Sequence, residues 1–377
     1  MSVIGRYVAR EVGAAVSFVL VGFLALFAFF DFINELDDIG RGGYRLQHAV
    51  ISVLLGLPSR IYELMPIAAL IGTIYAMAQF AQHSEFTAMR AAGLSRRRAL
   101  QSIVVIGAWL SVATAIVGEL LTPSAERLAQ TVRLGAMGGT VGAQFRSGLW
   151  IKDSVKDAEG NVQRLRFVNV GELLPDTTLK AVRVFEFDAE FRLAEIVSAA
   201  SGRFQAPDAW KLEQVERLVF TPVQVAGDAV ALRSDRAVQP SHLWPSELTP
   251  DIVGVLMLVP ERMSAWRLAQ YVQHLKDNQQ RADRYEIALW KKLIYPLAVI
   301  VMMALALPFA YLQVRAGGIG YKVFAGIMMG MAFHFLNGLF SHLGLLNTWP
   351  AWVAASAPSL VAVTLALGML AWVDRTR

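Results

Sequence analysis

The chain has 377 residues, of which 55% are hydrophobic and 17% are charged, and its mean hydropathy is +0.45. Soluble domains carry fewer apolar and more charged residues, so this composition excludes a soluble globular protein and indicates an integral membrane protein. The net charge of +5 does not indicate binding to nucleic acid, because the basic residues cluster beside apolar segments. The absence of cysteine excludes a disulfide framework and a thiolate metal site.

The first half of the chain contains three segments that can cross a membrane. Val12 to Phe30 is uncharged, and its length of about 20 residues is enough to cross the hydrocarbon core of a membrane. No small-residue cleavage site follows it, so we expect this segment to remain as a membrane anchor. A second span is predicted over Leu64 to Ser84, with its helix beginning near Ser59, after Pro58. A third span is predicted over Ala99 to Gly118.

The polar stretch between the second and third spans predicts a short helix at about residues 84–92. Ser84 is a good N-cap, and Glu85 follows in the first turn, where the helix dipole favours an acid. Gly93 can end the helix in a left-handed conformation, and Ser95 can cap the next helix. A simple turn would suffice here, so a separate helix suggests a role of its own. We expect Phe86 and Met89 to give it an exposed apolar surface.

Residues 123–263 have a different pattern, which predicts a β domain. Short segments with a period of two alternate with turn signals such as Pro175-Asp176 and Gly227-Asp228. Regular short strands of this kind predict a β-sandwich or jelly roll. The six expected strands are LWIKDS, VQRLRFVNV, LKAVRVFEFD, LAEIVSA, WKLEQVERLVF and VALRS.

The last part of the chain, residues 264–377, predicts an amphipathic helix capped by Ser264 and three further spans. Leu293 to Val314 is the fourth span. Val323 to Val373 contains no Asp, Glu, Lys or Arg and is long enough for two spans, which the turn at His342 to Pro350 separates. We therefore expect a polytopic α-helical protein with six transmembrane helices. Residues 1–122 hold helices 1–3, and the β-jelly-roll domain is inserted between helices 3 and 4.

Basic residues predict the orientation in the membrane. If there are six spans, four groups of arginines lie on the same side of the membrane. They occur before span one, between spans two and three, after span four and after span six. Positively charged loops stay in the cytoplasm, so we expect both termini in the cytoplasm and the β domain in the periplasm. These positions are Arg6, Arg10, Arg90, Arg96, Arg97, Arg98, Arg315, Arg375 and Arg377.

No motif for chemistry stands out. The sequence has no G-x-x-x-x-G-K-[ST] phosphate loop and no H-E-x-x-H, so we expect no ATP site and no metal site in this chain. Of the ionisable residues near the spans, His334 is the deepest; with Asn337 it could line a bundle interior, but we favour a hydrogen bond to a neighbouring helix. No series of acids and histidines crosses the membrane, which disfavours a proton-coupled transporter.

Two longer segments resemble a known family. They are LPSRIYELMPIAALIGTIYAMAQFAQHSEFTAMRAAGLS (Leu57 to Ser95) and MSAWRLAQYVQHLKDNQQRADRYEIALWKKLIYPLAVIVMMALALPF (Met263 to Phe309). They resemble the lipopolysaccharide export permeases of the LptF/LptG family, in particular through S-E-x-x-x-M-x-A-x-G-x-S and Y-x-x-x-L-W-x-K-x-x-x-P-L. The resemblance extends to the whole layout, and the second segment is more similar to the G-type than to the F-type subunit.

The resemblance implies a membrane subunit of an ABC transporter in the bacterial inner membrane. A G-type and an F-type permease would pair over two cytoplasmic ATPase subunits, which bind the ATP and Mg²⁺, so that this chain is not itself an enzyme and needs no cofactor. Lipopolysaccharide would pass to the jelly rolls and on to a bridge protein with a single membrane helix. The short helix matches the family's coupling helix, which docks on the ATPase. Its candidate residues are Ser84, Glu85, Phe86, Ala88, Met89, Arg90, Ala92 and Gly93.

One departure from the family concerns the end of the first span. Family members often carry lysines there that can meet lipid A phosphates, whereas this chain has Asp31, Glu35, Asp37 and Asp38. The phosphate contacts then move to Arg41, Arg45, Arg133 and Arg146, or the acids act through divalent cations bound to the lipid. A solvated acidic loop is the simpler alternative.

Two further sets of residues follow from the implied route of the lipid. A lateral gate to the partner permease is expected from span one (Val16, Val19, Phe23) and span five (Ala325, Met328, Met329, Ala332), although such stripes can simply face lipid. An acyl-chain groove is expected in the jelly roll, although these strands can instead pack a closed core. Its candidate residues are Leu165, Phe167, Val182, Val184, Phe185 and Phe187.

Other functions remain open at this point. The main alternative is a mechanotransmission permease, which uses the ATPase to move a periplasmic domain without passing lipid itself. A secondary transporter is disfavoured by the coupling helix, and a membrane-anchored scaffold by six spans where one would suffice.

Overall fold

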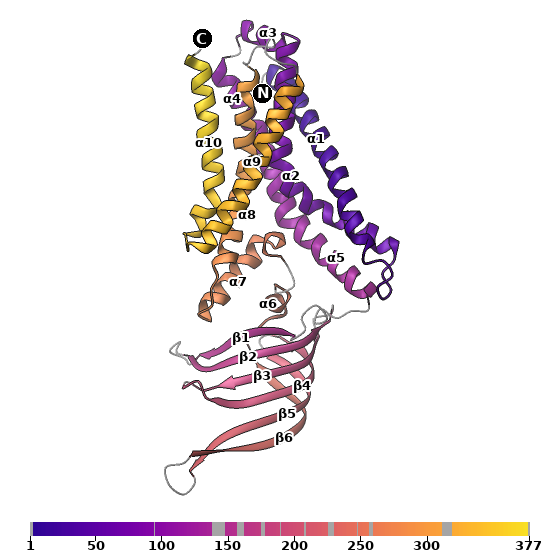
Figure 1. Cartoon of the computed structure of the whole chain (residues 1–377), viewed down its shortest axis with the longest axis vertical. Helices are drawn as coiled ribbons and strands as arrows, with labels where there is room; N and C mark the ends of the chain where they lie inside the picture. Colours follow the sequence, from indigo (N-terminus) through magenta and orange to yellow (C-terminus); the bar gives the residue numbers. More distant parts are fainter. Residues whose placement is uncertain are drawn as a thin grey trace.

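The computed structural model shows a bundle of long helices standing over a curved β-sheet (Figure 1). It describes residues 3–93, 95–137, 148–156, 162–174, 178–188, 190–206, 209–224, 230–246, 248–255, 259–310 and 319–375. We call the end of the bundle that carries the short helix α3 (Glu85–Ala91) the α3 end, and the opposite end the sheet end.

Within the described ranges, six helices are long and apolar enough to cross a membrane, as predicted. The first three are α1 (Val3–Leu36), α2 (Leu46–Gln82) and α4 (Arg96–Ile116); a π-helical turn, η1 (Val117–Leu121), joins α4 to α5 (Thr122–Met137). The last three are α8 (Asp283–Ala306), α9 (Ile319–Leu346) and α10 (Ala351–Arg375). The shorter helices are α6 (Pro250–Val255), η3 (Pro260–Arg262), α7 (Ala265–Asp277) and η4 (Leu307–Ala310).

The second helix is longer than predicted. It runs without a break through Pro58 and Pro66, whereas the sequence suggested a start near Ser59. Proline is tolerated inside membrane helices because neighbouring helices can satisfy the freed backbone groups. At 37 residues the helix is longer than one membrane crossing needs, and it offers α1, α5 and α8 a common surface.

Small residues set the closest helix crossings. A Cβ on Gly72 of α2 would lie 2.5 Å from the Cα of Val16 on α1, and a Cβ on Gly107 of α4 would lie 3.1 Å from the Cα of Ile300 on α8. Helices in membranes associate through such close backbone approaches, because apolar side chains gain little by leaving lipid. Glycine at these two positions thus fixes where α1 and α4 meet the core of the bundle.

The inserted domain is a six-stranded antiparallel sheet in the order β1-β2-β3-β4-β5-β6, consistent with the jelly-roll-like domain predicted between helices 3 and 4. All six expected strand segments are strands. Their bounds are β1 (Leu149–Lys156), β2 (Val162–Leu173), β3 (Leu179–Phe187), β4 (Leu193–Gln205), β5 (Ala209–Gln224) and β6 (Val230–Pro245).

The sheet curves so strongly that its two edges meet. Arg166 of β2 donates to the carbonyl oxygen of Pro245 at 2.9 Å and lies over the ring of Trp244, both at the end of β6. The Ser246 hydroxyl donates to Asp153 of β1 at 2.8 Å. Since β6 is the strand farthest from β1 and β2 in the sheet, these contacts cross its concave face and define an interior.

The helical part of the chain continues past the predicted domain limit of residue 123. The helix α5 continues to Met137, because the stretch from Thr122 has an amphipathic helical pattern, and the first strand starts at Leu149. Both chain termini lie at the α3 end of the bundle (Figure 1). An even number of spans produces this arrangement.

Candidate functional site

The short predicted helix exists as α3, but its first residue acts differently from expectation. Ser84 has φ of 60° and makes no side-chain cap, so the prediction of a serine N-cap is wrong; its carbonyl accepts from Ala88 N instead, at 3.0 Å. Ser95 does cap the next helix, accepting from Arg98 N at 3.4 Å. Gly93 has φ of 93°, which confirms the left-handed end that glycine permits.

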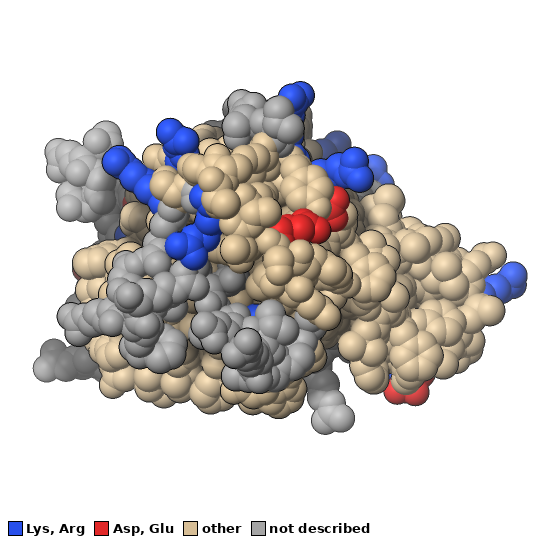
Figure 2. Space-filling view, turned by 90° about the horizontal axis from the view of Figure 1, so that it is seen from above, with Lys and Arg blue, Asp and Glu red and all other residues tan. Residues whose placement is uncertain are grey.

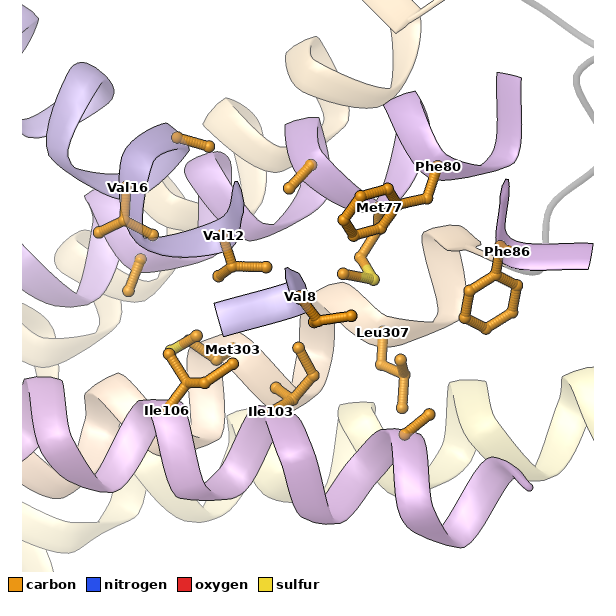
Figure 3. Packing of buried hydrophobic residues seen from close by; sticks show 14 of the residues in the cluster. Val8, Val12, Val16, Met77, Phe80, Phe86, Ile103, Ile106, Met303 and Leu307 are labelled. Atoms are coloured by element: carbon orange, nitrogen blue, oxygen red, sulfur yellow. The ribbon is translucent and has the colours of Figure 1, made fainter. Parts of the chain in front are cut away.

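Two large side chains fix α3 to the bundle. Phe86 and Met89 are only 6% and 9% exposed, so the prediction that they form an exposed apolar surface is wrong. Figure 3 shows Phe86 among Phe80 of α2, Val8 of α1 and Leu307 of η4. A seven-residue helix has little stability of its own, so burial of this face is what holds α3 in place.

The other face of α3 is open and small. Thr87, Ala88, Arg90 and Ala92 are exposed. Seen from the α3 end, Lys and Arg side chains spread over the surface around a small acidic patch (Figure 2). Glu85 is half-buried and accepts a hydrogen bond from the Tyr7 hydroxyl of α1 at 2.9 Å. Sequence reasoning missed Tyr7, because nothing local relates it to a residue 78 positions away.

At the sheet end, the acids of α1 are paired with arginines of other helices. Asp31 receives two hydrogen bonds from Arg60 of α2, at 2.7 and 2.9 Å, and Arg60 also binds Glu63 at 3.0 Å. Arg133 of α5 lies 3.4 Å from Glu35 and also contacts Asp38 of the α1–α2 connection. We call these side chains, together with Arg41 and Tyr44, the ion-pair cluster.

The ion-pair cluster changes the expected phosphate contacts. Arg41 binds Asp38 at 2.5 Å and Arg133 is shared by two acids, so neither is the unpaired cation that the prediction required. Arg45 is exposed at the start of α2, and Arg146 lies outside the described residues. Asp31, Glu35 and Asp38 therefore pair with arginines of the same chain, whereas Asp37 is exposed.

Tyr44 is the buried member of the ion-pair cluster. Its side chain is 1% exposed, and its hydroxyl donates to Glu35 at 2.7 Å and lies 3.1 Å from Ser52. Burial raises the pKa of this hydroxyl, and the hydrogen bond to the Glu35 carboxylate adds to the rise, partly offset by Ser52. Gly43 N donates to the carbonyl of Ala136, which ties the loop to α5.

The residues predicted for a lateral gate divide between two environments. Val16 is 2% exposed at the crossing with α2, so its assignment to an outward stripe is wrong, and Val19 and Phe23 are half-buried. On α9, Met328 and Ala332 are exposed, whereas Ala325 and Met329 pack against the core. An entirely apolar helix gives no sequence signal of which face packs. The outward side chains are Phe18, Val21, Leu26, Phe29, Tyr321, Phe324, Met331 and Phe335.

The residues predicted for an acyl groove lie on both faces of the sheet, since successive strand residues point to opposite faces. Val182 and Val184 belong to the interior, at 1% and 0% exposure. Leu165, Phe167, Phe185 and Phe187 lie on the outer face, so their inward assignment is wrong; there Phe185 stacks on Trp150 with ring centroids 5.7 Å apart.

The interior of the sheet is filled and, toward one end, charged. Trp210 is fully buried and donates through Nε1 to the carbonyl of Leu248 at 2.7 Å. Farther along the strands, Glu186 accepts from Arg166 at 2.7 Å and from Arg164 at 2.5 Å. Burial opposes charge on Glu186, but these arginines outweigh it and hold its pKa below the ordinary value.

A cavity of about 180 Å³ lies between α2, α8 and α9. It is lined by Tyr62, Glu63, Lys291, His334 and Asn337, among others. Lys292, also in the lining, donates to the carbonyl of Met263 and lies over the ring of Tyr62. His334 and Asn337 thus line the cavity together, with ionisable residues of α2 and α8 around them.

These features define a class: a polytopic membrane protein of six spans with a sheet domain inserted after the third. Within that class, a family model described as "Lipopolysaccharide export system permease LptF/LptG" matches residues 6–372. The chain is 30% identical over 370 residues to the lipopolysaccharide export system permease protein LptG of Escherichia coli K12, covering 98% of both chains. It is 28% identical over 369 residues to LptG of Haemophilus influenzae, covering 97% of both. The chain belongs to the LptF/LptG family of lipopolysaccharide export permeases.

Proposed function

We propose that this chain is the G-type membrane subunit of an ABC transporter that exports lipopolysaccharide. It lies in the bacterial inner membrane with both termini in the cytoplasm, which agrees with the arginines at the α3 end. An F-type permease forms the other half of the membrane unit. Two ATPase subunits bind at the α3 end, in the cytoplasm, and a bridge protein with a single membrane helix receives the lipid. Its relatives' names, which refer to lipopolysaccharide export, support the substrate.

The observation that carries this proposal is the attachment of α3. The helix is fixed by Phe86 and Met89, while Thr87, Ala88, Arg90 and Ala92 remain open to the cytoplasm. A rigid helix with one buried and one free face is suited to dock on another protein and to transmit its movement. The free face is small and polar, so docking depends on shape and charge more than on apolar anchors.

At the sheet end, the ion-pair cluster is the candidate contact for lipid A phosphates. Arg133 and Arg60 hold carboxylates in this structure. A phosphate carries more negative charge than a carboxylate and accepts the same bidentate hydrogen bonds from arginine, so it can exchange with them. Divalent cations can then bridge the released acids to the lipid.

The interior of the sheet favours the mechanotransmission alternative for the β domain of this subunit, in which the domain moves but does not itself carry lipid. Val168, Val184 and Trp210 fill the concave face, and the pair of Glu186 with Arg166 lies farther along it. Acyl chains gain nothing beside buried charges. The domain of this chain therefore acts as a moving platform, as in a mechanotransmission permease.

The docking test uses charge reversal on the free face of α3. The double variant Glu85→Lys/Arg90→Glu should lose co-purification of the ATPase subunits and export, while the chain remains inserted in the membrane. Asp277→Lys, an exposed acid at the end of α7, is the matched control and should retain both. Normal co-purification and export by the double variant would exclude α3 as the docking site.

A photo-crosslinker separates the two roles of the sheet. Placed at Val184 it reports on the interior, and placed at Phe185 on the outer face. Capture of lipopolysaccharide at Val184 alone, in an ATP-dependent way, would establish a conduit. Capture at neither position in a complex that exports would establish the platform role.

A further inference from the structure

A hydrogen bond joins the docking helix to the first transmembrane helix. The Tyr7 hydroxyl of α1 donates to the Glu85 carboxylate at 2.9 Å, and the Tyr7 ring lies 5.7 Å from that of Phe80 of α2. Tyr7 is 42% exposed, so burial does not require this hydroxyl to have a partner. The bond is charge-assisted, and such bonds are about twice as strong as neutral ones.

The apolar contacts beneath this bond leave little room for independent movement. Ile4 and Val8 of α1 face Phe86 and Met89 of α3 around a void of only about 20 Å³. Figure 3 shows Val8, Val12 and Val16 continuing along α1 into the bundle core. A gap of this size holds no more than one water, so a displacement of α3 must displace α1 or break the contact.

Beyond its first turns, α1 is one of the less enclosed long helices, as α9 is. Val12 and Val16 are buried, but Phe18, Val21 and Phe29 are more than half exposed. Farther along, a stripe of half-buried side chains follows α2, Arg60 of α2 lies over the ring of Phe27, and Asp31 and Glu35 are paired at the sheet end. The helix therefore packs on α2 along its length and is bound at both ends, so that it can transmit movement as one rigid element.

We infer that Tyr7 is a positioning residue, which fixes Glu85 to α1 so that α3 and α1 move together when the ATPase acts. This inference rests on the proposed docking of the ATPase on α3. It assigns two separable roles to Glu85: its charge faces the ATPase, while the carboxylate oxygen that accepts from Tyr7 couples the docking helix to α1.

The test measures lipopolysaccharide released per ATP hydrolysed, in proteoliposomes that contain the whole complex. Tyr7→Phe removes only the hydroxyl. It should lower this ratio about three- to ten-fold, which corresponds to the net loss of one solvent-exposed hydrogen bond, while the ATPase still co-purifies. A purely structural role would lower the yield of complex and leave the ratio unchanged.

The matched control is Tyr75→Phe on α2. Tyr75 is 39% exposed and its hydroxyl accepts from Gln79 at 2.7 Å within the same helix, so this variant removes a comparable hydroxyl without touching α1 or α3. It should leave the ratio unchanged. An equal fall in both variants would overturn the inference.

A second background tests whether Tyr7 acts through Glu85. In a Glu85→Ala complex, adding Tyr7→Phe should change the ratio no further, because the shared bond is already absent. A full additional loss would show that Tyr7 acts elsewhere, and an unchanged ratio in Tyr7→Phe alone would overturn the inference. Arg90→Glu leaves the bond between Tyr7 and Glu85 in place, so loss of the ATPase from an Arg90→Glu complex concerns docking alone and is distinguishable from loss of coupling.

Discussion

The two ends of α1 are attached by opposite kinds of interaction. At the α3 end, Val8 packs against Phe86 and a single hydrogen bond joins Tyr7 to Glu85. At the sheet end, α1 is held by carboxylates paired with arginines of α2 and α5. Apolar packing depends on the shapes of the side chains and is little affected by ions. In an ion pair, by contrast, one partner can be replaced by another ion of the same charge.

This difference matches what each end must do under the proposed function. The α3 end has to follow a partner protein through every ATPase cycle, so a contact that breaks only at a high energetic cost is suitable. The sheet end meets a lipid that carries phosphates, so a contact that an incoming anion can replace is suitable. The following variants test this comparison, from the largest expected effect to the smallest.

Phe86→Ala should break the α3 end. Removing a buried phenylalanine side chain typically costs about 3 kcal/mol or more, from lost burial and the cavity left behind. We expect a lower thermal unfolding temperature of the purified complex and faster tryptic cleavage at Arg90, as α3 loosens. Thr87→Ala, on the exposed face of the same helix, should change neither. Equal cleavage in the two variants would contradict a packed attachment.

Gly72→Ala should disturb the crossing between the two ends. The added methyl group would clash with the backbone of Val16, which cannot change rotamer as a side chain can. We therefore expect the free energy of unfolding to fall by about 2 kcal/mol. Gly56→Ala is the control, since a Cβ there has no atom within 4 Å and alanine favours the helix. A thermal unfolding temperature that is the same for both would show that α1 does not depend on this crossing.

Arg133→Ala should weaken the sheet end by about 1.5 kcal/mol, because Glu35 and Asp38 lose a partner in a half-buried setting. Hydrogen exchange of the α1–α2 connection should report it directly. In about 1 M salt the difference from the wild type should shrink, as exposed charges are screened. Arg10→Ala, at an exposed pair, should have no effect. A difference that is independent of salt would argue against ion pairing.

Tyr44→Phe should cost about 1 kcal/mol through the lost hydrogen bonds to Glu35 and Ser52. The folded-state pKa of Tyr44 is raised above the unfolded value near 10, so its contribution is complete below about pH 10 and is lost as the pH rises through the folded pKa. As the pH rises above about 10, the wild type should lose stability more steeply than Tyr44→Phe. Parallel melting curves over this range would contradict the assignment.

The spans and the strands of the described residues were predictable from the sequence, because hydropathy and alternation are local properties. Six spans, six strands, the Ser264 cap and the left-handed Gly93 all follow from patterns a few residues long. The prolines of α2 misled the prediction of its start, since the rule that proline interrupts helices holds less well inside a membrane bundle.

Side-chain environments were much less predictable. Val16 and Met329 were assigned to outward stripes and are packed inside, because an apolar helix gives no sign of which face meets protein and which meets lipid. Phe185 and Val184 were assigned to one groove although neighbours in a strand face opposite ways. The strand period was visible, but the choice of inner face depends on where the sheet bends.

The sequence by itself determined the class of the protein, the number of spans and strands, and the position of a short helix between spans two and three. Only the tertiary structure decided what each charged residue does. The acids after span one looked like a repelling surface until Arg60 and Arg133 were brought to them from α2 and α5. Likewise, Tyr7 became relevant to Glu85 only because α2 brings the chain back to the end of the bundle where α1 begins. Charge and hydrogen bonding act over a few ångströms in space, whereas the sequence patterns that can be read act over a few residues along the chain.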